Sequence, residues 1–535
     1  MSETSHNPAA AAAERHPLVQ MMAIALPSVV TMTSYTVMQF VDRLMVKEMA
    51  PDVDIVGAQG TAGLTTWLLM TFCVGVTGLV SSFVSQNLGA GKPERGSAFA
   101  WNSVWLSVGY WAVIMVPAAF LAPVIFGLYP ISDRVQGMAV EYAQVSFAGC
   151  VFALMGKGMH NYFFGLHRAG AVMVAVVLAG LSNVFFNAVL IFGEDGLQLD
   201  GEGGLTPLLQ RGCDFAAWIA ATLGIPALGL RGAALGTVLG NIIEFGVPFA
   251  IFLSPAFNRK FRTRAAWRPS LVCMRALFRK GWPAGLMFLN EIVTWQYLMS
   301  VLTPAGARAA AKAQGMSDAD AVAAGDIAVT SGYVALQWMH VSFMPAVGIA
   351  IATQAMVGKA VGAGDPDRAA RDGWLGTWIN IIYMGLWALL FVFAAEPMIG
   401  VFINSETPEA ERALVIALGI KIMLAAAVFQ VFDAMAITFS AALRGAGDTL
   451  WPGVVLVTLS WLCIVGGGHV VIWLFPETGG VGGWMAAAGC ILLVGIVLML
   501  RFMAGRWRSM SLVHDDREAG GSGGDAAAES NDRPA

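Results

Sequence analysis

Three acidic residues stand inside long apolar stretches of the sequence: Asp42, Glu291 and Asp433. An ionised carboxylate within a membrane costs about 3 kcal/mol or more, so such residues usually face the protein interior and serve function. Burial disfavours the charged form, which makes protonation or pairing with a cation favourable. We therefore interpret the three acids as candidate sites for coupling a cation, with a hydrogen bond between helices as the alternative. For Asp42 a position near the outer rim is a further alternative, because Arg43 and Lys47 are close in sequence.

Two asparagines, Asn183 and Asn187, are four residues apart within another apolar stretch and so share one face of a helix. Amide oxygens together with one carboxylate suit a hard monovalent cation, which prefers oxygen ligands. Paired amides also join transmembrane helices by hydrogen bonds, so the two asparagines alone leave both interpretations open. We give less weight to Glu244, Lys157 and Lys421, and we interpret His160, His340 and His469 as hydrogen-bonded packing residues.

Long apolar segments must position these residues. The chain has 535 residues, of which 57% are hydrophobic and only 12% charged, about half the charged fraction of a soluble domain. A single helix of about 20 apolar residues crosses a membrane. Twelve such stretches predict an all-α membrane protein with twelve transmembrane helices. They are 20–46, 58–87, 97–127, 137–166, 169–193, 228–254, 277–303, 327–360, 371–400, 412–443, 450–475 and 480–504.

The connections between these stretches alternate in charge. Every second connection is rich in Lys and Arg, and the others are acidic or neutral. Because short basic connections remain in the cytoplasm, we expect a multi-pass protein of the cytoplasmic (inner) membrane with both termini cytoplasmic. Two connections on the predicted outer face, 194–227 and 304–326, are long, and the segment 218–223 in the first is suited to a short interfacial helix.

Two sequence motifs occur twice, at nearly the same offset. Gly-Ala-Gly-Lys-Pro-Glu-Arg (89–95) recurs as Gly-Ala-Gly-Asp-Pro-Asp-Arg (362–368), and Gly-Leu-His-Arg-Ala-Gly (165–170) recurs as Ala-Leu-Arg-Gly-Ala-Gly (442–447). Such a repeat predicts two pseudo-symmetric six-helix bundles with a site at their interface. The expected parts are a disordered N-terminus (1–16), an N-terminal six-helix bundle (17–254), a basic cytoplasmic linker (255–276), a C-terminal six-helix bundle (277–505) and a disordered cytoplasmic tail (506–535).

The sequence also narrows the energy source. The segment Gly89-Ala-Gly-Lys92 is too short for a phosphate-binding loop and lacks its Ser or Thr. Transport would therefore run on an ion gradient, with Na⁺ or H⁺ as the coupling ion and no cofactor. The net charge of −4 gives no reason to expect a nucleic-acid partner. The six cysteines form no CxxC pair and are interpreted as small hydrophobic residues.

Several motifs resemble those of a known transporter family, the multidrug and toxic compound extrusion (MATE) exporters. The spacing from Pro27 to Asp42 is similar to that in the family's first helix. The spacing from Pro283 to Glu291 is similar to that at the start of the family's second half. The further resembling segments are Ala25-Leu-Pro27, Val41–Val46, Leu228–Thr237, Lys280-Gly-Trp-Pro283, Phe429–Asp433 and Ala442–Thr449. The likeness covers roughly residues 18–505, and the presence of all three acids resembles the NorM-like branch.

This resemblance implies export of cationic or amphipathic drugs and toxins in exchange for Na⁺ or H⁺. The implied cation-binding residues are Asp42, Asn183, Asn187 and Thr237 in the N-terminal half and Glu291 and Asp433 in the C-terminal half, and either set is a candidate for holding Na⁺. We expect the protein to act as a monomer surrounded by membrane lipid. One departure from the family pattern is His167-Arg168, where the family often has a Gly-rich turn.

Two other functions compete with drug export. A flippase for lipid-linked saccharides belongs to the same superfamily, but it would need a more cationic central cavity to hold a pyrophosphate, whereas the apolar stretches here are poor in Lys and Arg. A membrane-embedded enzyme would need convergent groups such as His/Asp pairs or HExxH, and the sequence contains no such motif. We therefore expect a transporter and not an enzyme.

Overall fold

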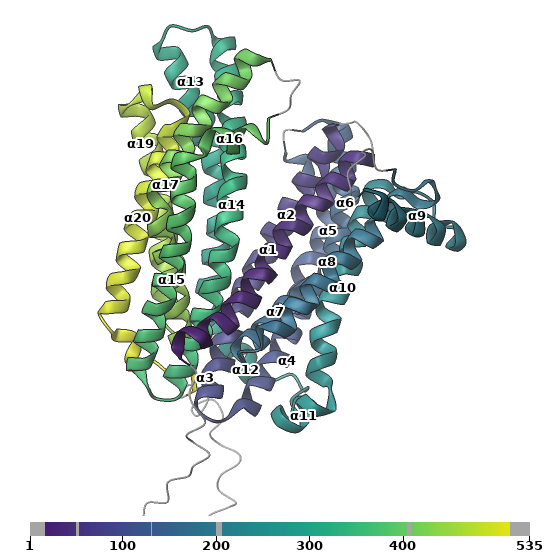
Figure 1. Ribbon diagram of the computed structural model, residues 1–535, viewed down its shortest axis with the longest axis vertical. Helices are drawn as coiled ribbons and strands as arrows, with labels where there is room; N and C mark the ends of the chain where they lie inside the picture. The colour runs from purple at the N-terminus through teal and green to yellow at the C-terminus, as the bar shows by residue number, and fades with distance from the viewer. Residues whose placement is uncertain (1–15, 50–52, 130, 199–205, 404–407, 514–535) are drawn as a thin grey trace, which may run out of the picture.

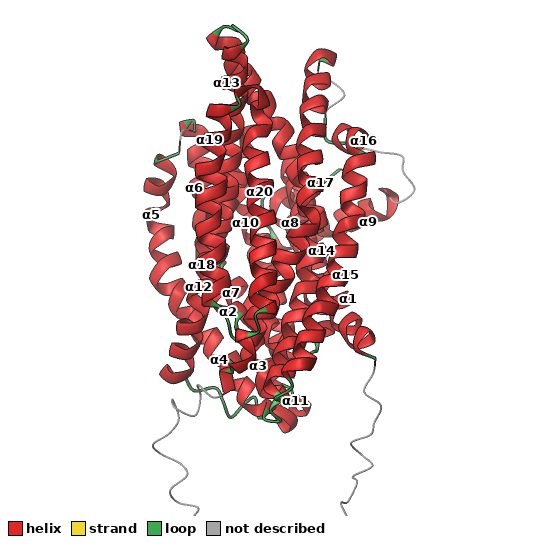
Figure 2. Ribbon diagram, turned by 90° about the vertical axis from the view of Figure 1, so that its left-hand side faces the viewer, coloured by secondary structure: helices red, strands yellow, loops and turns green. Residues whose placement is uncertain are grey.

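The computed structural model describes residues 16–49, 53–129, 131–198, 206–403 and 408–513. Throughout these ranges the chain forms helices joined by turns, with no strand (Figure 2). Ten of the helices are long and apolar enough to cross a membrane, and a bent pair makes an eleventh candidate. This confirms the predicted all-α membrane architecture.

The helices form two lobes (Figure 1). The N-terminal lobe contains α1 (Pro17–Met49), α2 (Val53–Gly78), α3 (Val80–Gly89), α4 (Pro93–Tyr110), α5 (Val116–Gly127), α6 (Asp133–Gly149), α7 (Val151–Gly165), α8 (Ala169–Phe192), α9 (Thr206–Leu223) and α10 (Gly229–Leu253). After the linker helix α11 (Pro255–Phe261), the C-terminal lobe contains α12 (Leu271–Tyr297), α13 (Thr303–Ala313), α14 (Asp318–Gly362), α15 (Pro366–Phe393), α16 (Ala395–Gly400), α17 (Glu409–Ala446), α18 (Leu450–Leu459), α19 (Gly467–Leu474) and α20 (Gly482–Met503).

Several predicted spans are interrupted helices. The span 137–166 is α6 and α7, bent by 47° at Cys150. Short π-helical segments at 111–115 and 460–466 interrupt two others. The span 277–303 is α12 followed by a π-helical segment at 298–302, and it is less apolar than the ten single candidates. Such breaks are tolerated in a membrane where neighbouring helices satisfy the freed backbone groups.

The first repeated motif forms a helix–turn–helix in each lobe. Gly91 and Gly364 adopt positive φ angles of 72° and 74°, a conformation that glycine adopts without steric cost. Pro93 and Pro366 then begin α4 and α15, where a missing backbone N–H costs nothing. The second repeated motif differs between the lobes, because the left-handed residue is His167 after α7 but Gly447 after α17.

The turns at 90–92, 166–168, 254–270, 363–365, 447–449 and 504–512 lie at one end of the molecule, which we call the basic end; it is the lower end in Figure 1. One hydrophobic cluster joins the lobes here, with Phe83 and Phe163 packing alongside Ile349 and Met356. The other large clusters, for example those around Phe147 and Trp484, contain residues of one lobe each.

Buried glutamines connect the lobes at the basic end. The side-chain amide of Gln354 donates to Ser82 Oγ at 3.0 Å, and that of Gln86 donates to the Gly445 carbonyl at 2.8 Å. The Gln86 amide oxygen accepts from the Leu512 backbone N–H at 2.7 Å. We call this set of contacts the inter-lobe seam. Because each glutamine is almost fully buried, loss of a partner would leave a desolvated polar group.

The structure adds detail to two predicted connections and corrects the predicted tail. The linker 255–276 contains α11 and the start of α12. The connection 304–326 is mostly helical, since α13 and α14 extend into it. Residues 506–513 of the predicted disordered tail are ordered, because Trp507 is fully buried against Phe502. The rest of that tail and residues 1–15 of the predicted disordered N-terminus lie outside the described residues.

The predicted interfacial helix in 194–227 is part of the longer α9. Its aromatic residues Phe215 and Trp218 stack on each other with ring centroids 5.9 Å apart. Both are more than half exposed. Amphipathic aromatic side chains of this kind favour a membrane–water interface.

Candidate functional site

Asp42 lies on α1 beside the two asparagines of α8. The Asn187 side-chain amide donates to Asp42 Oδ1 at 2.7 Å. The same amide lies 3.4 Å from Asn183 Oδ1, one helical turn away. Both asparagines are about 1% exposed, whereas Asp42 is half-buried. The structure therefore brings together the acid and the amide pair, on helices 145 residues apart in sequence.

Close packing of α8 against α10 forms the back of this site. A Cβ atom at Gly236 would stand 2.0 Å from Asn187 Oδ1, so only glycine allows this approach. Among the described residues, Asn187 Oδ1 and Asn183 Nδ2 are buried without a hydrogen-bond partner. An orphaned buried amide oxygen beside a carboxylate fits the oxygen ligands of a hard cation.

Thr237 contacts the site through other residues. Its hydroxyl donates to the Ala233 carbonyl of its own helix at 3.0 Å. The Thr237 hydroxyl also forms a hydrogen bond with Tyr142 of α6. Tyr142 in turn interacts electrostatically with Asp42. Tyr142 is buried and was not among the residues that the sequence singled out. We call Asp42, Asn183, Asn187 and Thr237 the amide site.

Glu291 and Asp433 come together from α12 and α17. Their carboxylates are close enough for their charges to interact, and both are half-buried. Arg444 falls between the predicted stretches 412–443 and 450–475, and in the structure it belongs to the last turn of α17 and interacts electrostatically with Glu291. Its guanidinium donates to Ser440 Oγ at 2.6 Å. We call Glu291 and Asp433 the acid pair.

A second charged cluster lies in the N-terminal lobe. Glu244 of α10 forms an ion pair with Lys157 of α7 at 2.9 Å. Tyr35 of α1 donates to the same carboxylate oxygen, and His160 Nδ1 lies 3.7 Å from it. Glu244 and Lys157 received less weight in the sequence analysis, because the sequence does not show which charges meet. The sequence signal that could have indicated this pair is the presence of opposite charges, Lys157 and Glu244, in two separate apolar stretches.

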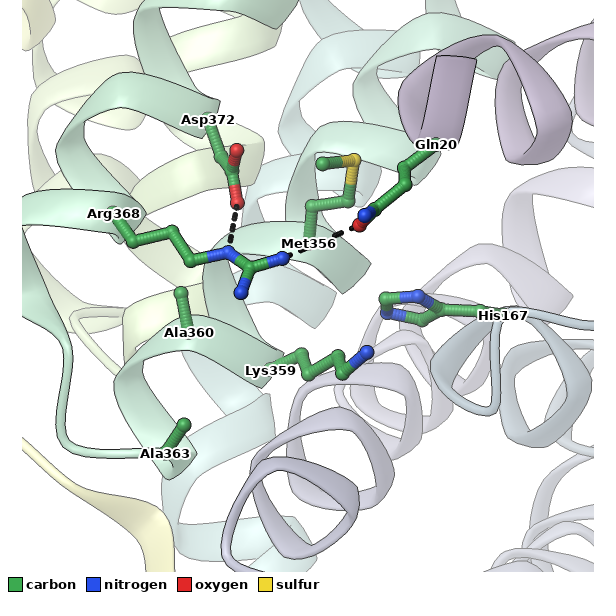
Figure 3. A pocket seen from close by; sticks show the side chains of 8 residues that line it. All are labelled: Gln20, His167, Met356, Lys359, Ala360, Ala363, Arg368 and Asp372. Atoms are coloured by element: carbon green, nitrogen blue, oxygen red, sulfur yellow. Dashed lines mark hydrogen bonds and ion pairs between the residues drawn. The ribbon is translucent and has the colours of Figure 1, made fainter. Parts of the chain in front are cut away.

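A small cavity lies at the basic end between the lobes (Figure 3). Its volume is about 30 Å³, which is enough to hold water. His167, Lys359 and Arg368 line it from three different elements, and Arg368 donates to Gln20 Oε1 at 3.3 Å. The cavity is too small for a drug-sized molecule and belongs to the inter-lobe seam.

Comparison with known proteins places this architecture in a family. The family model described as MatE matches residues 27–189 and 321–467, more than half of the chain and one segment in each lobe. The probable multidrug resistance protein NorM of Mesorhizobium japonicum is 26% identical over 492 residues, covering 90% of this chain and 92% of that protein. The protein of the same description from Pseudomonas aeruginosa PAO1 is 27% identical over 508 residues, covering 93% and 91%.

Solved structures agree on the fold. A structure described as the outward-facing conformation of a multidrug resistance MATE family transporter of the MOP superfamily matches with a TM-score of 0.74. The match has 19% sequence identity and covers 92% of this chain and 97% of the other. The chain therefore belongs to the MatE family, the multidrug and toxic compound extrusion family that its motifs resemble.

Proposed function

We propose that this protein is a cation-coupled antiporter that exports cationic or amphipathic drugs and toxins across the cytoplasmic membrane in exchange for Na⁺ or H⁺. The observation that carries the proposal is the amide site, where the half-buried carboxylate of Asp42 meets buried amides inside an apolar bundle. The multidrug resistance descriptions of the relatives support the same reading of the cargo.

The amide site is the proposed coupling site of the N-terminal lobe. A bound Na⁺ would be neutralised by Asp42 and would take the orphaned oxygen of Asn187 as a further ligand. A proton would instead neutralise the carboxylate alone. In either case the bound ion changes the charge inside the lobe. It shifts the equilibrium between the inward-open and outward-open conformations only if its affinity for the two conformations differs.

The acid pair is the proposed second coupling site. Two neighbouring carboxylates cannot both be ionised cheaply, so one of them readily binds a proton or shares a cation. Arg444 offsets part of this negative charge from the side of Glu291. The acid pair would thus bind and release a proton or a cation in the C-terminal lobe.

Alternating access follows from the arrangement of the lobes. The inter-lobe seam holds the lobes together at the basic end, where Gln354 and Gln86 bond across it. We take the basic end to be cytoplasmic, because its turns are the connections rich in Lys and Arg. Rocking the lobes so that this seam separates would give access from the cytoplasm.

The flippase alternative receives less support. Two cations of the helices lie near acidic residues, since Lys157 pairs with Glu244 and Arg444 interacts electrostatically with Glu291. An interior whose cations are neutralised in this way is poorly suited to a pyrophosphate.

Transport by the purified protein in proteoliposomes tests the proposal. A fluorescent organic cation should move when a pH gradient or a Na⁺ gradient is imposed, and ²²Na⁺ flux distinguishes the two ions. Asp42→Asn should abolish the gradient dependence, because a neutral amide neither binds a proton nor offsets Na⁺. Unchanged gradient dependence in Asp42→Asn would reject the coupling role of the amide site.

A further inference from the structure

We infer that Tyr35 and Glu244 form a binding site for an organic ammonium group in the N-terminal lobe, occupied in this structure by the ammonium of Lys157. A cationic substrate would displace Lys157 from this site. The inference rests on the proposed function, which it deepens by locating where the positive charge of a substrate binds.

The geometry around the Lys157 ammonium is that of a ligand site. Its Nζ atom lies 2.9 Å from Glu244 Oε1 and 3.7 Å from the centre of the Tyr35 ring. A cation over an aromatic face is attracted by the ring, most strongly where water is excluded. The Tyr35 hydroxyl donates to the same Glu244 oxygen, so ring and carboxylate are held in a fixed relation. A carboxylate and an aromatic face together recognise ammonium groups in general.

The two partners of the ion pair differ in accessibility. The Glu244 side chain is 4% exposed, whereas that of Lys157 is 19% exposed. Glu244 is therefore the anchored, buried partner, and Lys157 reaches it from the more accessible side. A buried carboxylate needs a compensating cation, but that cation need not be the lysine. The flexible four-carbon stem of Lys157 allows its ammonium to withdraw when another takes its place.

The site lies directly below the amide site on the same two helices. Tyr35 precedes Asp42 by seven residues on α1, and Glu244 follows Thr237 by seven residues on antiparallel α10. Seven residues are about two helical turns. The ammonium site and the amide site are therefore roughly 10 Å apart along the helices, on the same helix faces. An ion at Asp42 and an ammonium at Glu244 would thus act on one shared wall of α1 and α10. This arrangement gives drug and coupling ion a direct electrostatic influence on each other.

Ethidium binding to the purified full-length protein, measured by fluorescence anisotropy, tests the inference. Lys157→Met removes the competing ammonium and keeps an unbranched stem, so it should tighten ethidium binding about tenfold. Glu244→Gln should weaken binding about tenfold, and the double variant should bind as weakly as Glu244→Gln. If Lys157→Met binds ethidium no more tightly than the wild type, the pair is structural and the inference fails.

Controls address folding and position. Lys421→Met removes another lysine from an apolar helix, and it should leave ethidium affinity unchanged. Tyr35→Leu and Tyr35→Phe leave the ion pair in place and keep the inference testable if Lys157→Met fails to fold. Tyr35→Leu should weaken binding about threefold through loss of the ring, and it should weaken binding more than Tyr35→Phe, which keeps the ring and loses only the hydroxyl that donates to Glu244. Wild-type affinity in Tyr35→Leu would overturn the site.

The outcomes separate this inference from the proposed function. If the wild type neither binds ethidium nor transports any organic cation, the proposed cargo is wrong and the site falls with it. If the wild type binds and exports ethidium while changes at Tyr35, Lys157 and Glu244 leave its affinity unaltered, the proposed function stands and only this site is rejected.

Discussion

The three intramembrane acids have different neighbours. Asp42 receives a hydrogen bond from the neutral amide of Asn187. Glu291 and Asp433 instead interact with each other electrostatically, and Glu291 also interacts with Arg444. A carboxylate among amides offers a compact oxygen site for one ion, whereas two coupled carboxylates titrate as a unit. The two lobes therefore offer chemically different candidate sites to the proposed coupling ion.

The acid pair is tested by neutral substitutions of the same size. We expect Glu291→Gln and Asp433→Asn to leave folding intact and to abolish coupled export, because an amide cannot take up a proton or neutralise a cation. Size-exclusion profiles and drug efflux from cells expressing each variant provide the measurement. Wild-type efflux rates in both variants would show that these residues are structural.

The amide site predicts unequal effects of two similar substitutions. Asn187→Ala removes the donor to Asp42 and should lower the free energy of unfolding by about 1–3 kcal/mol. Asn183→Ala, one turn away on the same helix, loses only a 3.4 Å contact and should cost less. Denaturation of the two purified variants in detergent by titration with SDS compares them directly. Equal losses would contradict the assignment of Asn187 as the partner of Asp42.

At the scale of elements, glycines determine how closely helices of the two lobes approach. Gly75 of α2 lies against α12, where a Cβ atom would stand 2.6 Å from both the Ala284 carbonyl oxygen and the Gly285 Cα. Because both neighbours are backbone atoms, neither can move aside as a flexible side chain would. The contact between α2 and α12 therefore depends on the absence of a side chain.

Gly75→Ala should therefore force these helices apart and destabilise the closed basic end, by about 1–3 kcal/mol for an overpacked contact. We expect a longer distance between spin labels at the exposed positions Glu94 and Arg371, measured by double electron–electron resonance. Gly63→Ala is the matched control on α2, because nothing lies within 4 Å of a Cβ atom there. An unchanged distance in Gly75→Ala would mean that the lobes close without this contact.

At the scale of the whole molecule, the proposed orientation in the membrane rests on the charges of the basic end. Cys273 lies in the first turn of α12 at that end, and Cys213 lies on α9, in the long connection that the sequence predicts on the outer face. Both are partly accessible. A membrane-impermeant thiol reagent added to sealed cells should label Cys213 and leave Cys273 unmodified. External labelling of Cys273 would reverse the proposed orientation.

The seam between the lobes also contains a titratable group. His167, in the turn between α7 and α8, donates from Nε2 to the Ala355 carbonyl of the other lobe at 3.1 Å. Burial lowers the pKa of His167 to about 4, the carbonyl of Ala355 opposes this shift, and the charges of Lys359 and Arg368 add to it. The imidazole is thus neutral when the seam is closed, whereas a free histidine has a pKa of about 6.5.

Acid should therefore weaken the seam. The opened or unfolded state binds a proton below about pH 6.5 and the closed state only below about pH 4. The contribution of His167 is present above this range and is lost as the pH falls through it. The melting temperature of the wild type should fall more between these pH values than that of His167→Gln, which keeps a donor but does not titrate. Equal falls would show that His167 does not respond to pH in this way.

Much of this architecture could be predicted from the sequence because it depends on local properties. Apolar length predicts transmembrane helices in lipid, where every backbone group must be satisfied within a helix. The Gly-x-Pro turns after α3 and α14 likewise depend on conformations that only glycine and proline favour. The acids Asp42, Glu291 and Asp433 could be singled out because a charge in an apolar stretch is costly wherever the fold places it.

The tertiary structure decided which of these residues meet. Lys157 and Glu244 each look like an isolated charge in the sequence, and they become a pair only because α7 packs beside α10. Arg444 falls between two predicted transmembrane stretches, but it belongs to the last turn of α17 and interacts electrostatically with Glu291. Trp507 belongs to a polar terminal stretch, yet packing against Phe502 buries it completely. Such pairings join residues far apart in the chain, and local composition contains no information about them because they depend on how whole helices pack.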